Sequence, residues 1–502
     1  MHCMLHSRVT LLIFCLALAA GCATTQPPVD PSRLGQLVLE NDTRLIAPAD
    51  FSFTGSGTYI FPDGTQWSGN FLEGKLHGRG REDRAGTIYQ GNYAHGKRHG
   101  NGTLTESSGL RYEGMWRDGE RSGYGGQLFA DGSKYEGDWH ADAREGFGAF
   151  RTATGHEYEG QWLADKMHGY GAMRETNGVL YEGMWSQGVR AGVGRETRPD
   201  GSVYEGQFLQ DQKHGEGVET HSDGTSHQGA WQEGHILGLG DRTTRAGLIF
   251  SGAWTRNLIT FGMVTLPDGG QYAGDLFAAK GRGVSPDFVD WLSKEAANGS
   301  AYAQYFLALT YLDYAEPSRD LALAQVHLTS AANAGLSDAQ YRLAMITKDS
   351  DIQRAVRLLE AAAAQKHGMA NALLGEYRHV GMYVEKDLDR AIEHYETAVR
   401  SGVGNAINNL SWLLATSTTQ HADPARAVEL IQPLAIYTGN WQYLDTLAAA
   451  HARLNHFELA EDIQDEAIRL LGAVDINNEQ TDVLSDLQSR LSLYQREEPY
   501  LE

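Results

Sequence analysis

Pairs of aromatic residues recur along the first half of this 502-residue sequence and are its clearest candidates for chemistry. A first ring opens an aromatic-x-Gly motif, and a second ring follows four residues later. An exposed row of such rings would offer flat apolar faces on which sugar rings stack, so we treat it as a candidate glycan-binding surface. The alternative is that the rings pack on one another as a core. The candidate residues are Tyr112, Trp116, Tyr135, Trp139, Tyr158, Trp162, Tyr181 and Trp185.

The thiol of Cys22 is a second chemical candidate. Arg8 precedes an apolar run, residues 9–20, that suits a signal peptide and is too short to span a bilayer of roughly 30 Å. The run ends in Leu18-Ala19-Ala20-Gly21-Cys22, which resembles the lipobox of bacterial lipoproteins. The resemblance implies cleavage before Cys22, a palmitate-type lipid on its thiol and, because Ala23 is not Asp, sorting to the outer membrane. An ordinary signal peptide with an unmodified Cys22 is the alternative.

Other reactive side chains do not combine into a site. Histidines recur at one position of the repeat, but neighbouring copies would lie roughly 10 Å apart, too far to share a metal ion with ligands about 2 Å away. The sequence also lacks Gly-x-Ser-x-Gly, phosphate-loop, His-Glu-x-x-His and paired-cysteine motifs. We therefore predict that the protein is not an enzyme and uses no metal and no cofactor. The histidines are His77, His99, His168 and His214.

The aromatic pairs predict β-hairpins that repeat every 22 or 23 residues. Positions 0, 2 and 4 of a strand share one face, so Tyr112, Gly114 and Trp116 point the same way. A turn-forming residue follows seven positions after the first ring, and the return strand opens with Gly-x-Gly. These motifs resemble the MORN repeat, of which residues 112–119 are a complete copy. The resemblance covers about ten copies and implies an elongated all-β antiparallel meander sheet.

Two charged rows accompany the rings. Glutamates follow the first ring in five copies and should form a solvated ladder on the opposite face; they are Glu113, Glu136, Glu159, Glu182 and Glu205. A basic row at the turn edge could meet anionic lipid head groups; it contains Arg98, Arg121, Arg144, Arg190 and Lys213.

From residue 285 the hydrophobic period becomes helical. The segment Ala303-Gln304-Tyr305 returns as Ala339-Gln340-Tyr341, and aspartates at N-cap-like positions precede the second helices. An alanine four residues after each aspartate lets paired helices approach closely. These segments resemble Sel-one-like repeats, and residues 444–467 resemble a tetratricopeptide repeat, which together imply an all-α helical-repeat solenoid. The aspartates are Asp320, Asp351, Asp387 and Asp423.

These patterns divide the chain into five segments. They are a lipoprotein signal peptide at 1–21, a tether at 22–50, MORN repeats at 51–284, Sel-one-like helical repeats at 285–435, and a tetratricopeptide-like repeat with a capping helix at 436–502.

The charge distribution limits the classes of function that the protein could have. The chain has a net charge of −22, and residues 285–502 contribute 16 basic and 31 acidic side chains to it. Nucleic-acid binding is excluded, because a phosphate backbone needs an electropositive face. We expect a non-enzymatic scaffold, lipid-anchored in the outer membrane and facing the periplasm, whose acidic helical repeats bind basic or aromatic-rich protein partners of a cell-envelope assembly. The alternative is glycan or peptidoglycan binding, or lipid binding, through the aromatic surface.

Overall fold

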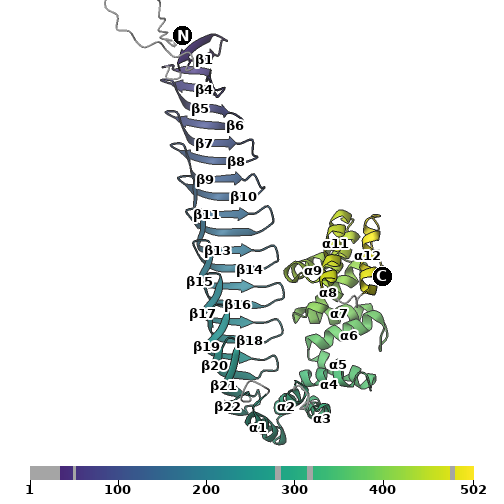
Figure 1. Cartoon of the computed structure of the whole chain (residues 1–502). Helices are drawn as coiled ribbons and strands as arrows, with labels where there is room; N and C mark the ends of the chain where they lie inside the picture. The colour runs from purple at the N-terminus through teal and green to yellow at the C-terminus, as the bar shows by residue number, and fades with distance from the viewer. Residues whose placement is uncertain (1–33, 49–51, 278–283, 314–319, 475–480) are drawn as a thin grey trace, which may run out of the picture. The chain divides into compact units, whose positions relative to one another are not determined.

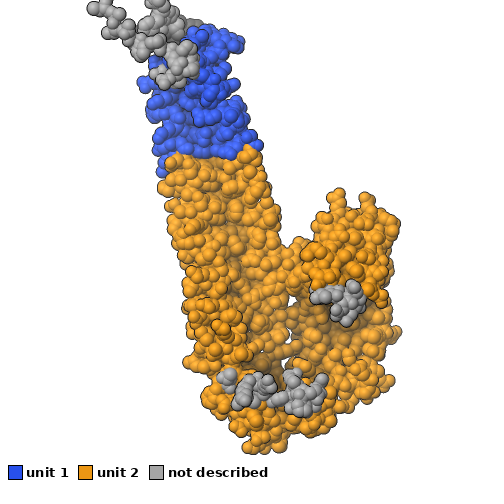
Figure 2. Space-filling view, in the orientation of Figure 1, with its two compact units in different colours: residues 1–107, 116–119 blue, residues 108–115, 120–502 orange. Residues whose placement is uncertain are grey.

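The computed structural model describes residues 34–48, 52–277, 284–313, 320–474 and 481–502. Within these residues the chain forms 22 β-strands and then 12 α-helices (Figure 1). The strands belong to one antiparallel sheet, which confirms the predicted order of an all-β repeat domain before an all-α one. The chain divides into two compact units, residues 1–107 with 116–119 and residues 108–115 with 120–502 (Figure 2).

The first unit contains a hairpin that the sequence patterns did not predict. Strand β1 pairs antiparallel with both β2 and β3, and the buried Leu37 lies opposite Leu45 in one pair and Tyr59 in the other. Residues 34–48 were assigned to the tether at 22–50, so the sheet begins earlier than predicted. Its short strands carry no repeat motif, which is why they were missed. The strands are β1 (Leu34–Leu39), β2 (Arg44–Pro48), β3 (Gly55–Ile60), β4 (Gln66–Leu72), β5 (Lys75–Arg84), β6 (Thr87–Ala94) and β7 (Lys97–Thr105).

The predicted signal peptide, residues 1–21, and Cys22 lie outside the described residues. Their processing therefore stays a prediction.

The second unit, which holds all but the last two residues of β8, repeats one hairpin design. From β9 to β22 each strand pairs antiparallel with the next in chain order. The strands are β8 (Arg111–Arg117), β9 (Glu120–Leu128), β10 (Lys134–His140), β11 (Ala143–Arg151), β12 (Glu157–Leu163), β13 (Lys166–Arg174), β14 (Leu180–Ser186), β15 (Val189–Thr197), β16 (Val203–Leu209), β17 (Gln212–Thr220), β18 (Ser226–Gln232), β19 (His235–Thr243), β20 (Ile249–Thr255), β21 (Leu258–Thr265) and β22 (Gln271–Asp275).

Strand β12 shows the alternation of buried and exposed side chains that the period of two predicts. In β12, Tyr158, Gly160 and Trp162 are buried and their neighbours are exposed. A β-bulge lies between the glycine and the second ring, as between Gly160 and Trp162. At the following turn Asp165 has a φ of +65°, a conformation that aspartate tolerates better than most residues. The turn and strand assignments from the repeat are therefore confirmed.

The described residues from 286 onward form twelve helices. They are α1 (Pro286–Ala297), α2 (Ala301–Asp313), α3 (Leu321–Asn333), α4 (Ser337–Thr347), α5 (Ile352–Ala364), α6 (Gly368–Val380), α7 (Leu388–Arg400), α8 (Gly404–Thr416), α9 (Pro424–Thr438), α10 (Trp441–Arg453), α11 (Phe457–Val474) and α12 (Thr481–Tyr494).

The four predicted N-caps are all in place. The Asp387 side chain accepts a hydrogen bond from the Arg390 backbone N–H at 3.0 Å, and Asp320, Asp351 and Asp423 cap their helices in the same way. The alanines four residues later are fully buried; they are Ala324, Ala355, Ala391 and Ala427. Small side chains at these positions allow the close helix contacts of the array.

Candidate binding surfaces

All eight predicted binding residues lie in the core of the sheet. Their exposed fractions run from 0% for Tyr112 to 6% for Trp162. The rings meet edge to face: the centroid of the Trp139 ring lies 5.4 Å from that of Tyr112 and 5.2 Å from that of Tyr135, at interplanar angles of 87° and 89°. The rings therefore pack on one another, and the predicted glycan-binding surface is not accessible in these residues.

In six copies of the repeat the first ring is a tyrosine that lies over a pair of glycines; these tyrosines are Tyr89, Tyr112, Tyr135, Tyr158, Tyr181 and Tyr204. Gly137 and Gly148 face each other across β10 and β11, and a Cβ on Gly137 would lie 2.7 Å from the Tyr135 hydroxyl oxygen. This hydroxyl donates a hydrogen bond to the Asp138 carbonyl oxygen at 2.9 Å. The same bond, to the carbonyl three residues later, is made by Tyr112, Tyr158, Tyr181 and Tyr204. The second glycine is therefore required by the tyrosine of its own repeat, and the first by that tyrosine together with the backbone of the paired strand.

The second ring connects neighbouring repeats. Trp139 Nε1–H donates to the Gly125 carbonyl oxygen at 3.0 Å, and Trp162 Nε1–H donates to that of Gly148 at 3.0 Å. Each acceptor belongs to the preceding repeat. Since these ring atoms are satisfied inside the sheet, the column has a structural role. Burial raises the pKa of the Tyr112, Tyr158 and Tyr181 hydroxyls to about 12.

The predicted basic row is held by the turns and rings beside it. Arg144 Nε donates to Asp165 Oδ1 at 3.0 Å, and the Arg144 guanidinium carbon lies 4.2 Å from the centroid of the Trp162 ring. Arg121 makes the equivalent bond to Asp142 and lies over Trp139. These cations stabilise the sheet, so lipid head groups would have to compete with existing partners.

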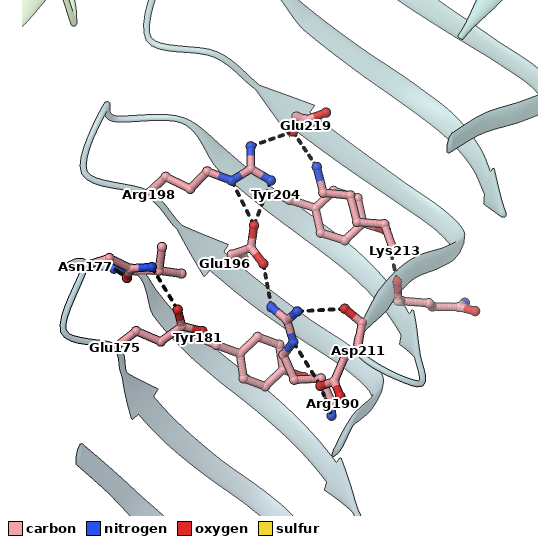
Figure 3. A network of polar contacts seen from close by, with 12 residues as sticks. Glu175, Asn177, Tyr181, Arg190, Glu196, Arg198, Tyr204, Asp211, Lys213 and Glu219 are labelled. Atoms are coloured by element: carbon pink, nitrogen blue, oxygen red, sulfur yellow. Dashed lines mark hydrogen bonds and ion pairs between the residues drawn. The ribbon is translucent and has the colours of Figure 1, made fainter. Parts of the chain in front are cut away.

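Two buried glutamates extend this polar network across the ring face, which is the face of the sheet that carries the buried Tyr and Trp side chains (Figure 3). Glu196 lies opposite Tyr181, and Glu219 lies opposite Tyr204. Arg198 joins them, with Nε 2.9 Å from Glu196 Oε1 and Nη1 3.0 Å from Glu219 Oε1. Burial opposes ionisation of Glu219, but hydrogen bonds from Lys213 and Arg198 outweigh it and lower its pKa. Both carboxylates are paired with cationic side chains inside the sheet, which indicates that they stabilise the fold.

The opposite face carries exposed aromatic rings that the sequence analysis missed. Tyr124, Phe147 and Tyr170 are 57%, 55% and 57% exposed. Each is the middle residue of a Gly-x-Gly motif, whose second glycine faces the buried rings. The alternation of a strand then directs the middle side chain to the other face, and this signal could have revealed them.

A groove of about 630 Å³ lies on this face over β8 to β14. Its lining includes the small residues Gly126, Ala149 and Ala172, each two positions after an exposed ring. The predicted glutamate ladder contributes to it and is exposed, as expected. Four cationic and four anionic side chains balance one another in the lining: Arg111, Lys134, Arg151, Arg174, Glu113, Glu136, Glu157 and Glu159.

The helical array has a charged pocket of about 470 Å³ around the loop between α6 and α7. Lys386, Asp389 and His421 line it, with His421 Nε2 3.0 Å from Asp389 Oδ1. Val380 and Tyr383, in the same segment, are 64% and 59% exposed. Apolar side chains beside charged ones are typical of a surface that binds protein.

Among the residues that the structure describes, no group of three or more His, Cys, Asp or Glu side chains could hold a metal ion. No helix in the described ranges is both long enough and apolar enough to cross a membrane.

Two family models match the sequence. The MORN repeat model matches residues 53–66, 67–85, 89–111, 112–134, 135–157, 158–178, 181–203 and 204–226. The Sel1 repeat model matches residues 301–336, 337–367 and 368–403. The chain thus carries MORN repeats followed by Sel1 repeats. The last matched MORN repeat ends at the first residue of β18, so β19 to β22 lie beyond it.

Solved structures with some likeness to the chain include three Sel1-type proteins. A Sel1 repeat protein from Oxalobacter formigenes is 24% identical over 33% of this chain and 69% of its own, with a TM-score of 0.30. The protective antigen c5321 of uropathogenic Escherichia coli is 21% identical over 36% and 40%, with a TM-score of 0.31. A Klebsiella pneumoniae sel1 repeat protein is 18% identical over 39% and 99%, with a TM-score of 0.28. The comparison with curated proteins finds no match.

The packed ring column predicts a large effect of Trp139→Ala on stability. Removing this buried indole should lower the free energy of unfolding by about 3 kcal/mol, measured by urea denaturation. Tyr124→Ala, which removes an exposed ring from the neighbouring strand, is the matched control and should cost about 0.5 kcal/mol or less. Equal, small effects of both changes would show that Trp139 is not packed.

Proposed function

We propose that this protein is a non-enzymatic scaffold of a bacterial cell envelope. Its Sel1 repeats bind a protein partner, while a lipid on Cys22 anchors it in the outer membrane with the repeats facing the periplasm. Sel1 and related helical repeats generally bind other proteins, which supports this function. The observation that carries it is the exposure of Val380 and Tyr383, in the same chain segment as residues that line the charged pocket of the α6–α7 loop.

The chemistry of the partner follows from charge. Residues 285–502 carry 16 basic and 31 acidic side chains, so a basic segment would be attracted over a distance and would bind more slowly as salt rises. An aromatic or aliphatic anchor on that segment would cover Val380 and Tyr383, since apolar contacts surrounded by charges provide most of the affinity in small interfaces.

Crosslinking tests the partner site in the intact protein. Full-length protein is crosslinked in its native envelope and isolated, and the captured proteins are identified by mass spectrometry. We expect a partner with a basic segment, and a Val380→Ser/Tyr383→Ala variant should capture about tenfold less of it. The control Leu323→Ser/Val326→Ser removes exposed apolar side chains from α3 and should capture the usual amount. Undiminished capture by the first variant would contradict this site.

Acylation is tested separately, because the anchor and the partner site can fail independently. Cys22→Ala should leave an uncleaved precursor that incorporates no labelled palmitate, since the lipid is attached to the thiol before cleavage. Cys15→Ala, within the apolar run, should leave processing and labelling intact. If the Cys22 variant is still cleaved at the same bond and still labelled, the protein is not a lipoprotein of this kind.

A further inference from the structure

The fold does not require aromatic rings at the positions of the three exposed rings on the outer face. They lie on β9, β11 and β13, at the middle position of Gly-x-Gly (Figure 1). Other copies of the repeat form the same hairpin with different residues there, namely Arg79, Asn101, Val193, Glu216 and Leu239. The sheet therefore folds without a ring at this position, and three consecutive rings need another explanation.

The same three copies also have a small residue on this face, which makes a hollow in the lining of the groove; the rings stand beside the groove and do not line it. Two positions after the rings stand Gly126, Ala149 and Ala172, whereas the copies on either side have larger residues, such as Thr103 and Arg195. Strand pairing places Glu136 between Gly126 and Ala149, and Glu159 between Ala149 and Ala172. The result is three successive units, each with a ring, a small residue and carboxylates beside it.

The Tyr124 ring, and the backbone that carries the other two rings, are held in place before binding. The Tyr124 hydroxyl donates to Glu136 Oε1 at 2.7 Å, and the Phe147 backbone N–H donates to Asp138 Oδ2 at 3.0 Å. The Tyr170 backbone N–H donates to Gln161 Oε1 at 3.0 Å. Side chains and backbone held in place before binding lose less entropy when a ligand arrives.

The spacing of the three units indicates the distance after which an elongated ligand must present the same group again. Neighbouring rings are two strands apart, which is about 9.6 Å along the sheet. An extended peptide repeats its side chains every two residues, about 6.7 Å, and does not match this distance. A β-1,4-linked sugar chain presents the same face with every second sugar, over a length that does match. Sugars also stack their apolar faces on aromatic rings and exchange hydrogen bonds with carboxylate and guanidinium groups.

Charge distinguishes between classes of polymer. The groove has four cationic and four anionic side chains, and some already pair with one another, as Arg111 with Glu113 at 2.7 Å and Arg151 with Glu157 at 3.4 Å. A polyanion or a polycation would meet as much repulsion as attraction there. The hydroxyl groups of a neutral polymer can donate hydrogen bonds to the glutamates and accept hydrogen bonds from the arginines.

We propose that the outer face of β8 to β14 binds an extended, uncharged β-1,4-linked glycan. The sugars stack on Tyr124, Phe147 and Tyr170 and fill the hollows over Gly126, Ala149 and Ala172. This site lies on the opposite face from the ring columns that the sequence suggested for glycans. It is also separate from the partner site on the helical array, so either proposal can fail without the other.

Titration calorimetry of the full-length protein with chitohexaose and cellohexaose tests the site. We expect binding of at least one of these neutral β-1,4-linked hexamers, and weaker binding of the α-linked maltohexaose. The variant Tyr124→Ala/Phe147→Ala/Tyr170→Ala should bind about tenfold more weakly or worse. Ala149→Arg should also weaken binding by filling the central hollow, while keeping a residue type that Arg195 shows the fold accepts.

The control changes apolar side chains at the same repeat position outside the groove. Val193→Ala/Leu239→Ala, at sites that are 64% and 76% exposed, should bind the hexamers like the unchanged protein. Unchanged thermal unfolding of all variants shows that they are folded. The proposal is overturned if neither β-linked hexamer binds, if the ring variant binds as tightly as the original, or if the control loses as much. It is also overturned if sedimentation shows that the ring variant dissociates a dimer, because the face would then join two copies.

Discussion

The contact between each tyrosine and its two glycines determines how the sheet is built. The Tyr135 ring covers Gly137 and Gly148, and its hydroxyl reaches the Asp138 carbonyl oxygen across the bulge. A side chain on either glycine would displace the ring, and without the ring the next tryptophan would lose its edge-to-face neighbour. Trp139 in turn bonds to the glycine carbonyl of the preceding repeat. A single layer of strands thereby acquires a continuous core without a second layer to cover it.

This construction commits one face of the sheet to folding and leaves the other available. On the ring face, arginines and glutamates are also engaged, as Arg144 with Asp165 and Arg198 with Glu196. On the outer face the fold fixes only the alternation of side chains, so residues there can vary between copies. Such variable positions on a rigid repeat scaffold are where binding specificity is expected. Tyr124, Phe147 and Tyr170 are a local departure of this kind, and Val380 with Tyr383 is another on the helical array.

The sequence predicted what the repeat geometry constrains. The strand period, the turn at Asp165, the helix cap at Asp387 and the close packing at Ala391 recur in many copies, because each copy must satisfy the same backbone geometry. Strands β1 and β2 could not be predicted because they lack the repeat motif. The sequence does not decide whether the Tyr and Trp columns are buried, for a different reason. Periodicity showed that Tyr and Trp share a face, but whether that face is covered depends on packing between repeats, which spacing alone does not determine.

The most direct test of this account is a double-mutant cycle on the tyrosine and glycine contact. Gly148→Ala should lower the free energy of unfolding by about 3 kcal/mol, because the added methyl group overlaps the Tyr135 ring. The cost should fall by about 1 to 3 kcal/mol when Tyr135→Leu is already present, since the overlapping ring is gone. Gly126→Ala is the control, because the nearest atom to its added carbon is 3.8 Å away. If Gly148→Ala is as mild as the control, or costs the same with and without Tyr135, the contact does not organise the sheet.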